Sequence, residues 1–476
     1  PIASTATSPM LGLEDVPGAT PGIDLAAHGY LEEEYFVSGT ANIYHYDAQW
    51  NRAVKRSDVP YTTRLILRRP KDVSRFSGTI QFECAHPQGA RTSNWNGTKA
   101  YIVRHGDAYV NVMCGGDIPT RQVPLDQQPT AAPRLLKWFD AARYGSIEWP
   151  EDDGIRWDVM AQVGGLLKGK SPSNPLAGYR VARMYAAGWS FTGSLWRTYV
   201  NEGFPEQYRM PDGSPIFDGY LYGISASAVG GGYDPLDGEE KLPLDVPKRF
   251  TKAIDVPVIE MMSQNEAPTN VGPEPPEGDL AKGGFRLYQV PGITHGEGLG
   301  VRDNGQAYQL RQRGYTLAPP APTGCSVESS DVSLGDLAAA ALANMDAWVR
   351  RGIAPPKAPP MKIDAVAKQV IHDALGNADG GLRPAQLAVP LAKYGDYGEE
   401  SVAACRAPSP YARIKRVPLS AEQLAQLYTG KADYLAKFKA RLDVMVRERW
   451  LMQPEADRQF EAARLRADAA FMNASK

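Results

Sequence analysis

Residues 181–193 read VARMYAAGWSFTG, and this stretch decides the fold. Residues 181–187 have the apolar character of a buried strand, and residues 193–201 have a helical pattern. A serine between a strand and a helix, with small neighbours, is typical of a nucleophile elbow, because the nucleophile's backbone is held in a strained turn. We therefore interpret Ser190 as a nucleophile, although Thr192 stands where the usual pattern has Gly. The alternative is a Gly-Ser turn at the surface.

Further strand candidates flank this stretch on both sides. Before it they are residues 35–46, 61–67, 78–84 and 108–114, and after it they are residues 217–224, 256–262 and 285–290. Helical patterns occur between several of these strands, including a short helix predicted over residues 96–105. Alternating strands and helices favour an α/β fold with a mostly parallel central sheet.

Two loops further along the chain carry candidate partners for Ser190. His295 lies in PGITHG, directly after one predicted strand, and Glu266 lies in SQNEAP, directly after another. The carboxyl ends of parallel strands meet at one edge of a sheet, so we expect these three side chains to lie there together. Glu260 lies within its strand and is expected to point into a face of the sheet. The pattern predicts that His295 takes the proton of Ser190 and that Glu266 orients the imidazole.

Four segments carry a resemblance to a known family. They are GYLEEEYFVSGTANIYHYD at 29–47, GWSFTG at 188–193, SQNEA at 263–267 and GITHG at 292–296. With the chain order serine, acid, histidine, they resemble the α/β-hydrolase superfamily, and in particular the bacterial proteins called only "alpha/beta hydrolase domain" proteins. The likeness covers most of residues 29–355. In that family Gln is common where this chain has Phe191, and Asp is more usual where it has Glu266.

The resemblance implies a mechanism but no particular substrate. It implies a serine hydrolase that cleaves a carboxylic ester through an acyl-enzyme intermediate on Ser190, with His295 and Glu266 completing the triad. One alternative is an acyltransferase that uses the same triad and passes the acyl group to an alcohol other than water. A second alternative is a non-catalytic binding protein with a hydrolase-like fold.

An oxyanion hole requires backbone N–H donors aimed at the developing negative charge. The first donor is expected from Phe191, the residue after the nucleophile, and the second from the loop after residues 78–84. Pro87 in that loop has no N–H, which leaves Ala85 or His86. The sequence thus predicts an oxyanion hole between the elbow and this loop.

Trp95 and Trp189 are candidates for the walls of an apolar substrate pocket, although tryptophan is more often simply part of the core. No group of His, Asp and Glu has metal-ligand spacing, and no GxxxxGK[ST] motif for phosphate is present. We therefore expect no metal and no organic cofactor. The expected partner is a small-molecule ester.

Composition excludes several other classes of protein. The 476 residues are 43% hydrophobic and 22% charged, which excludes disorder over the whole length. The 52 basic and 54 acidic residues give a formal charge of −2, so no overall field attracts nucleic acid or an anionic membrane. The longest apolar run, residues 337–343, is far shorter than the ~20 residues of a transmembrane helix. The oligomeric state stays open.

Cysteine usage leaves the cellular compartment open. Cys84–Cys114 and Cys325–Cys405 are possible disulfides, and the first pair ends two strands that should be neighbours in this fold. The sequence begins without Met, which fits both a removed export signal and a shortened chain. We expect a periplasmic or secreted protein, with the cytoplasm as the alternative.

Three regions are expected along the chain: a flexible lead-in over residues 1–28, a catalytic core over residues 29–355 and a mainly helical extension over residues 356–476. Asp336 is a plausible N-cap for the last core helix. In the extension, Ser420-x-x-Gln423 matches a capping box, and Leu435, Phe438, Leu442 and Met445 recur at helical spacing. We expect part of this extension to form a cap or lid over or beside Ser190, and the alternative is that it braces the far side of the sheet or forms an oligomer contact, with no role in substrate selection.

Overall fold

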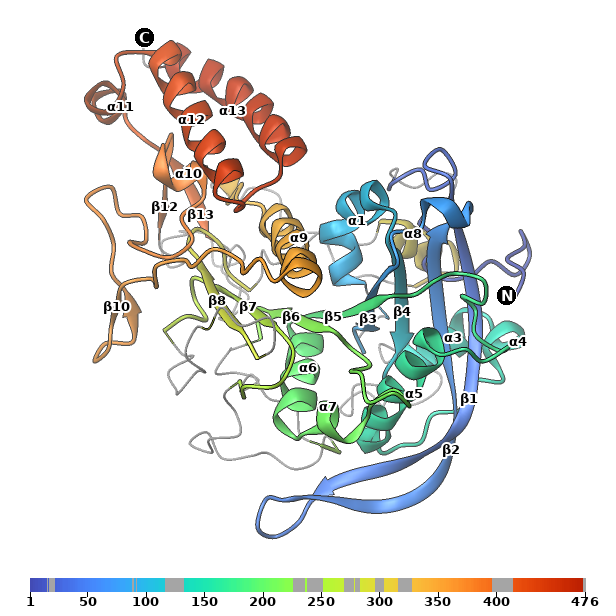
Figure 1. Ribbon diagram of the computed structural model, residues 1–476. Coiled ribbons are helices and arrows are strands. Elements are labelled where there is room, and N and C mark those ends of the chain that lie inside the picture. The colour runs from blue at the N-terminus through green and yellow to red at the C-terminus, as the bar shows by residue number, and fades with distance from the viewer. Residues whose placement is uncertain are drawn as a thin grey trace.

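The computed structural model describes residues 1–14, 16, 22–87, 90, 92–115, 132–225, 236–237, 251–268, 278, 283–295, 304–315, 328–395 and 414–473. A sheet of eight strands in the order β1-β2-β4-β3-β5-β6-β7-β8 forms the centre of the molecule (Figure 1). The strands from β3 to β8 run parallel to one another, while β1 and β2 are antiparallel to their neighbours. Their bounds are β1 Tyr30–Tyr46, β2 Arg52–Pro70, β3 Thr79–Ala85, β4 Ala108–Met113, β5 Arg183–Trp189, β6 Gly219–Gly223, β7 Val258–Ser263 and β8 Phe285–Val290.

Helices cover both faces of this sheet. In Figure 1, α1 and α9 lie on one face and α5 and α6 on the other, and each pair packs into a separate hydrophobic cluster. The parallel strands are therefore apolar on both faces, as expected for a buried sheet. The core helices are α1 Ser93–His105, α3 Ala132–Phe139, α4 Ala141–Tyr144, α5 Arg156–Lys168, α6 Phe191–Asn201, α7 Phe204–Gln207, α8 Asn304–Gln312 and α9 Leu334–Arg351, with short 3-10 helices at Val73–Arg75 and Asp153–Ile155. The predicted α/β-hydrolase fold is confirmed.

The strand boundaries differ most from prediction at the antiparallel edge. β1 and β2 extend well beyond the residues predicted for them and form a long two-stranded ribbon (Figure 1). Residues 54–58 of β2 are exposed, so the chain there carries no apolar alternation that could mark a strand. β5 ends at Trp189 rather than at residue 187, which brings the elbow directly to the end of the strand.

Part of the expected lead-in packs against the core: residues 10–12 and 14 are buried, whereas residue 1 and residues 3–7 are exposed. Leu11 is fully buried, and its N–H donates to the hydroxyl of Tyr144 at 2.9 Å. The buried Arg68 donates from Nη2 to the carbonyl of Gly12 at 2.9 Å. Small residues and prolines suggested flexibility, whereas partners distant in sequence hold the segment in place.

The extension contains α10 Ala385–Ala388, α11 Ala421–Leu427, α12 Lys431–Arg447 and α13 Gln453–Asn473, with short strands β10 Ile363–Asp364, β11 Gln369–Val370, β12 Ala392–Gly395 and β13 Lys415–Pro418. β13 pairs with β9 Glu328–Ser329 of the core. In Figure 1, α12 and α13 form a further layer over α9. The mainly helical character of the extension agrees with the prediction.

Details of the helix ends follow the predicted chemistry with one correction. The capping box of Ser420 and Gln423 is present. The N-cap of α9 is Ser333, whose Oγ accepts from the N–H of Asp336 at 3.2 Å. The carboxylate of Asp336 instead binds Arg458 and Gln459 of α13, so this acid joins the extension to the core.

In α12, most of the predicted apolar positions are buried. Phe438, Leu442 and Met445 are at most 2% exposed, whereas Leu435 is only half-buried and Tyr434 takes the deeper position beside it. The helix therefore packs through the predicted stripe, shifted by one residue at its first turn.

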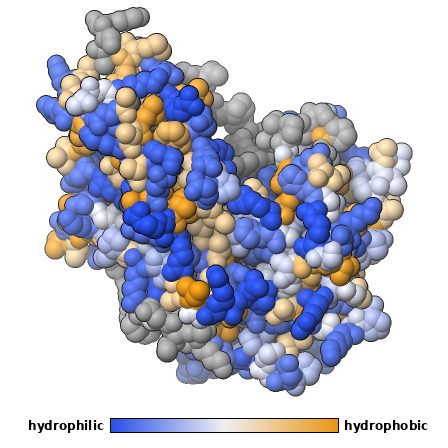
Figure 2. All heavy atoms as spheres, turned by 45° about the horizontal axis from the view of Figure 1, so that its top comes forward, coloured by the Kyte–Doolittle hydropathy of each residue, from blue (hydrophilic) through white to orange (hydrophobic). Residues whose placement is uncertain are grey.

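Figure 2 shows hydrophobic residues lying singly or in small groups among hydrophilic ones on one face of the molecule. Among the described helices, none is both long enough and apolar enough to cross a bilayer.

Cys84 and Cys114 form a disulfide between the ends of the adjacent strands β3 and β4, with their Cα atoms 5.6 Å apart. Cys325 and Cys405 lie outside the described residues.

Candidate active site

Ser190 occupies a sharp turn between β5 and α6. Its backbone has φ +58° and ψ −126°, an uncommon conformation for a residue with a side chain. Close packing on both sides explains the neighbouring glycines. A Cβ atom at Gly188 would lie 2.4 Å from the carbonyl oxygen of Thr192, and one at Gly193 would lie 2.9 Å from the carbonyl oxygen of Gly223. The sequence therefore folds locally into an elbow that presents Ser190 at the end of its strand.

Thr192 explains why the elbow tolerates a departure from the usual pattern. Its Oγ1 accepts a hydrogen bond from the N–H of Trp189 at 2.9 Å and donates one to the carbonyl of Trp189 at 2.9 Å. The hydroxyl of Thr192 thus binds the backbone of Trp189 and stabilises the turn that contains Ser190. Glycine is needed one position later, at Gly193, because that is where the helix approaches β6.

The structure brings Ser190, His295 and Glu266 together at the carboxyl edge of the sheet. Oγ of Ser190 lies 2.7 Å from Nε2 of His295, and Nδ1 of His295 lies 3.0 Å from Oε1 of Glu266. Glu266 is 1% exposed, and the imidazole is largely covered. A hydroxyl, an imidazole and a carboxylate in this order form a path for proton transfer from the hydroxyl to the imidazole.

Glu260 and Glu266 have different partners. The carboxylate of Glu260, in the middle of β7, is fully buried and forms an ion pair with Arg197 of α6. Its second oxygen accepts from Oγ1 of Thr251 at 3.1 Å. The side chain of Glu260 therefore points into the face of the sheet that α6 covers, in agreement with the prediction that it points into a face of the sheet.

Ser263 and Asn265 support the acid and the histidine, and the sequence analysis did not assign them a role. Oγ of Ser263 donates to Oε2 of Glu266 at 2.5 Å, and the N–H of His295 donates to Oδ1 of Asn265 at 3.1 Å. Both residues lie in the SQNEA segment that marked the acid loop. Their polar side chains beside a single acid are the signal that could have identified them.

Two of the residues predicted for the oxyanion hole, Phe191 and His86, have neighbouring rings. Phe191 is the first residue of α6, in the turn where helix N–H groups lack intrahelical acceptors. Ala85 ends β3, and the ring of the following His86 lies 5.9 Å from the ring of Phe191. The guanidinium of the buried Arg156 lies 5.7 Å from the same ring and pairs with Asp153. This cation beside the elbow was not anticipated from the sequence.

Trp95 and Trp189 are both packed in the core, at 0% and 1% exposure. Nε1 of Trp95 donates to Glu14 of the N-terminal segment at 2.6 Å, and Nε1 of Trp189 donates to Oδ1 of Asn94 at 3.1 Å. The bond from Trp189 joins β5 to α1 at the elbow, and the bond from Trp95 joins α1 to the N-terminal segment. A role of either indole as a pocket wall stays a prediction.

The buried acid Glu83, in β3, binds the first turn of α1. Its carboxylate accepts from the N–H groups of Asn94 and Trp95 at 2.7 and 3.1 Å and from the hydroxyl of Tyr109 at 2.6 Å. Burial nevertheless raises the pKa of Glu83 to about 7, since desolvation of the charge outweighs these hydrogen bonds. The group therefore titrates close to neutral pH.

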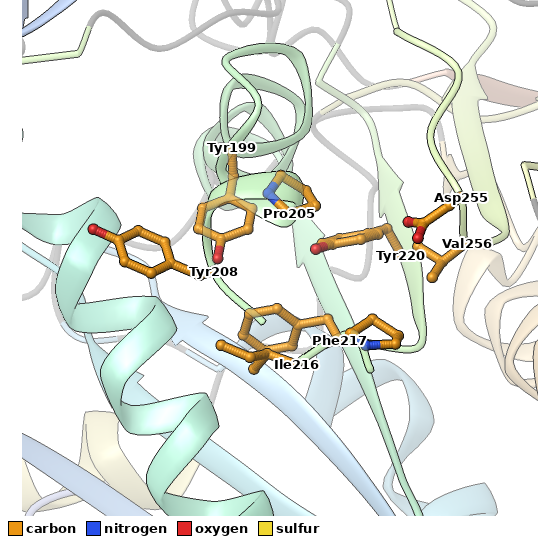
Figure 3. A pocket seen from close by; sticks show the side chains of 9 residues that line it. Tyr199, Pro205, Tyr208, Ile216, Phe217, Tyr220, Asp255 and Val256 are labelled. Atoms are coloured by element: carbon orange, nitrogen blue, oxygen red, sulfur yellow. The ribbon is translucent and has the colours of Figure 1, made fainter. Parts of the chain in front are cut away.

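A separate hollow lies at the end of the parallel strands opposite to Ser190. Aromatic rings of Tyr199, Tyr208, Phe217 and Tyr220 surround it (Figure 3). Tyr220 stands near the start of β6, whereas Ser190 hydrogen bonds to Gly223 at the end of that strand. The hollow is therefore distinct from the site around Ser190.

Within the described ranges, no three His, Cys, Asp or Glu side chains are arranged to hold a metal ion.

The chain was compared with solved structures and with protein families. Some solved hydrolases match at low similarity. The esterase Est22 is 14% identical over 50% of this chain and 66% of its own, with a TM-score of 0.27. A dienelactone hydrolase from Anabaena variabilis is 11% identical over 60% and 96%, with a TM-score of 0.28. Brefeldin A esterase, described as a bacterial homologue of human hormone sensitive lipase, is 10% identical over 63% and 68%, with a TM-score of 0.27.

The family comparison extends over nearly the whole chain. No curated protein sequence matches it. The family model described as "Alpha/beta hydrolase domain" matches residues 1–461, which include both the N-terminal segment and most of the extension. The chain belongs to the alpha/beta hydrolase domain family.

Proposed function

We propose that this chain is a serine hydrolase that cleaves carboxylic esters through an acyl-enzyme intermediate. One observation carries the proposal: Ser190 Oγ lies 2.7 Å from His295 Nε2, and the opposite ring nitrogen lies 3.0 Å from the buried carboxylate of Glu266. Membership of the alpha/beta hydrolase domain family supports it.

In the proposed first half-reaction, Oγ of Ser190 attacks the ester carbonyl carbon while Nε2 of His295 accepts the hydroxyl proton. The tetrahedral intermediate then collapses, the C–O bond to the alcohol breaks, and His295 donates its proton to the leaving alkoxide. Glu266 keeps Nδ1 protonated and stabilises the imidazolium that exists between these steps. The products are an alcohol and an acyl group on Ser190.

Water completes the proposed cycle. A water molecule attacks the acyl carbonyl as His295 removes one of its protons, and collapse of the second intermediate releases the acid and returns the proton to Ser190. In both intermediates the oxyanion would be stabilised by the N–H of Phe191 and by an N–H from Ala85 or His86. The proximity of the His86 and Phe191 rings supports this pairing of loops.

A fluorophosphonate probe and a panel of p-nitrophenyl esters of graded chain length test the proposal. We expect the probe to label wild-type protein at Ser190 and the esters to be hydrolysed. Ser190→Ala should remove labelling and lower kcat by several orders of magnitude, on the order of 10⁴-fold or more, without unfolding the protein. A Ser190→Ala variant with wild-type activity would overturn the proposal.

The same assay separates the two alternatives. When an alcohol is added, a product mixture that contains more of the new ester than of the free acid would identify an acyltransferase. Binding of esters with no labelling and no turnover would identify a non-catalytic binding protein.

We also propose a periplasmic or secreted location. The disulfide between Cys84 and Cys114 supports it, because such bonds persist in oxidising compartments and are rare in the cytosol. Fractionation of cells that produce the protein from its native gene tests the location, and recovery from the cytoplasm alone would contradict it.

A further inference from the structure

The acid loop, residues 263–268, and the histidine loop, residues 290–295, are bound to each other. The N–H of Gln264 donates to the carbonyl of Ile293 at 2.9 Å, and Oε1 of Gln264 accepts from the N–H of Gly292 at 2.8 Å. Asn265 adds the bond from the N–H of His295. The distance between Glu266 and His295 therefore depends on how these two loops are held as a pair.

One segment of the extension, residues 361–387, contacts β8 and the histidine loop. The carbonyl of Gln289, in β8, accepts from the N–H of Leu382 at 2.7 Å, and its Oε1 accepts from the N–H of Met361 at 2.7 Å. Two residues beyond β8, Gly292 has φ +84°. A Cβ atom there would lie 2.6 Å from Cδ1 of Leu387, so the fully buried Leu387 packs directly onto the backbone of the loop.

The same segment also supports the acid loop. Ala267, the residue after Glu266, is 1% exposed and forms a small hydrophobic cluster with Met361 and Ala378. Figure 1 shows the part of the extension that carries β10 and β12 beside β7 and β8, the two strands from which the loops emerge. Met361 thus contacts the acid loop through its side chain and β8 through its backbone.

We infer that residues 361–387, which we call the brace, position Glu266 and His295 relative to each other, so that this part of the extension completes the catalytic centre. Met361 and Leu387 are positioning residues: each acts through the loop that it packs against. The inference rests on the proposed function. It assigns to the described part of the extension a role different from the lid expected from the sequence.

The brace is expected to affect the rate of the reaction. Loops that carry catalytic groups gain precision when packing fixes them, and an error of about 1 Å in the position of a catalytic group can lower a rate by about 100-fold. Removing the side chain of Leu387 leaves a cavity against Gly292, into which the histidine loop can relax. Such a change alters the position of His295 without removing any reacting group.

Leu387→Ala, Met361→Ala and Leu442→Ala form the test. Leu442 is a matched control, because it is equally buried in the extension but lies in α12. We expect Leu387→Ala to lower kcat by roughly 10- to 100-fold with KM little changed, and to slow labelling of Ser190 by the fluorophosphonate to the same extent. Leu387→Met, which refills the volume, should restore most of the rate. Leu442→Ala should lower the melting temperature while kcat, measured well below it, stays at the wild-type value.

The outcomes separate the possibilities. Met361→Ala removes the side chain that packs on Ala267 of the acid loop. This variant tests the brace if Leu387→Ala does not fold. Wild-type labelling rates in folded Leu387→Ala and Met361→Ala would overturn the brace while leaving the proposed function intact. An altered preference between short and bulky esters at an unchanged labelling rate would also overturn it and would indicate a lid. A wild-type protein that is neither labelled nor active would instead overturn the proposed function itself.

Discussion

The hydroxyl of Ser263 lies 2.5 Å from Oε2 of Glu266, the carboxylate oxygen that does not face His295. The N–H of Ser263 lies 3.3 Å from the same oxygen. Ser263 is the last residue of β7, so the end of the strand itself fixes the orientation of the acid that follows it. Both carboxylate oxygens of Glu266 therefore have hydrogen-bond partners, Ser263 on one and His295 on the other.

Ser263→Ala should therefore leave the carboxylate of Glu266 in place but less firmly oriented. The carboxylate of Glu266 loses a charge-assisted hydrogen bond, and we expect a decrease of about 1–3 kcal/mol in the free energy of unfolding. The kcat for a p-nitrophenyl ester should fall, by less than in Glu266→Gln. Denaturant unfolding and steady-state kinetics on the same preparation check both effects, and an unchanged kcat would show that the bond to His295 alone orients the acid.

Glu266→Gln and Glu260→Gln should separate catalysis from stability. An amide at position 266 cannot keep His295 in the required tautomer, so kcat should fall by about 10³- to 10⁴-fold with the fold retained. At position 260 the amide removes the carboxylate that pairs with the buried Arg197, with an expected loss of about 3–5 kcal/mol of stability. Below its melting temperature Glu260→Gln should keep wild-type kcat. A reversed order of the two kcat values would assign the orienting role to Glu260.

Thr192→Val should show what the threonine contributes to the elbow. Valine has the same shape but lacks the hydroxyl that binds both the N–H and the carbonyl of Trp189. We expect a loss of about 1–3 kcal/mol in stability from the unpaired backbone groups and a lower kcat, because Ser190 is no longer held in its turn. Thr192→Ser keeps the hydroxyl and should retain most of the activity. Equal kcat values for the two variants would contradict this role.

The parts of the site that local patterns could predict are those built within single segments. β8 has the predicted bounds Phe285–Val290, and Ser190, Glu266 and His295 each follow a strand whose apolar character is visible in the sequence. Because parallel strands end at a common edge, three separate patterns were enough to place the three side chains together.

The parts that could not be predicted depend on contacts between distant segments. Nothing near residues 1–14 indicates that Arg68 will donate to the carbonyl of Gly12, or that Leu11 will be buried beside Tyr144. The packing of Leu387 on Gly292 joins residues 95 positions apart. Such contacts leave no periodic signal, because each uses one residue of an irregular segment.

Glu83 makes the stability of the fold sensitive to pH near neutrality. Its pKa is raised from the ordinary 4.5 to about 7 in the folded protein, because burial penalises the charge. Between these two values the folded state binds more protons than the unfolded state, so stability falls as the pH rises. The contribution is fully present below about pH 4.5 and is lost as the pH rises through about 7. Asp107, whose pKa burial raises to about 6, acts in the same direction.

Glu83→Gln should remove its share of this pH dependence. Between pH 5 and pH 8 we expect wild-type protein to lose about 2 kcal/mol more unfolding free energy than the variant, as denaturant titrations at both values would measure. The amide also offers one acceptor fewer to the N–H groups of Asn94 and Trp95, so the variant should be less stable at pH 5. Asp107→Asn is the matched control: it should remove only its own part of the pH dependence and leave the loss that Glu83 causes between about pH 4.5 and pH 7. If Glu83→Gln and wild type lose the same free energy between the two pH values, Glu83 is already ionised well below neutral pH in the folded protein, and its three hydrogen bonds outweigh the cost of burial.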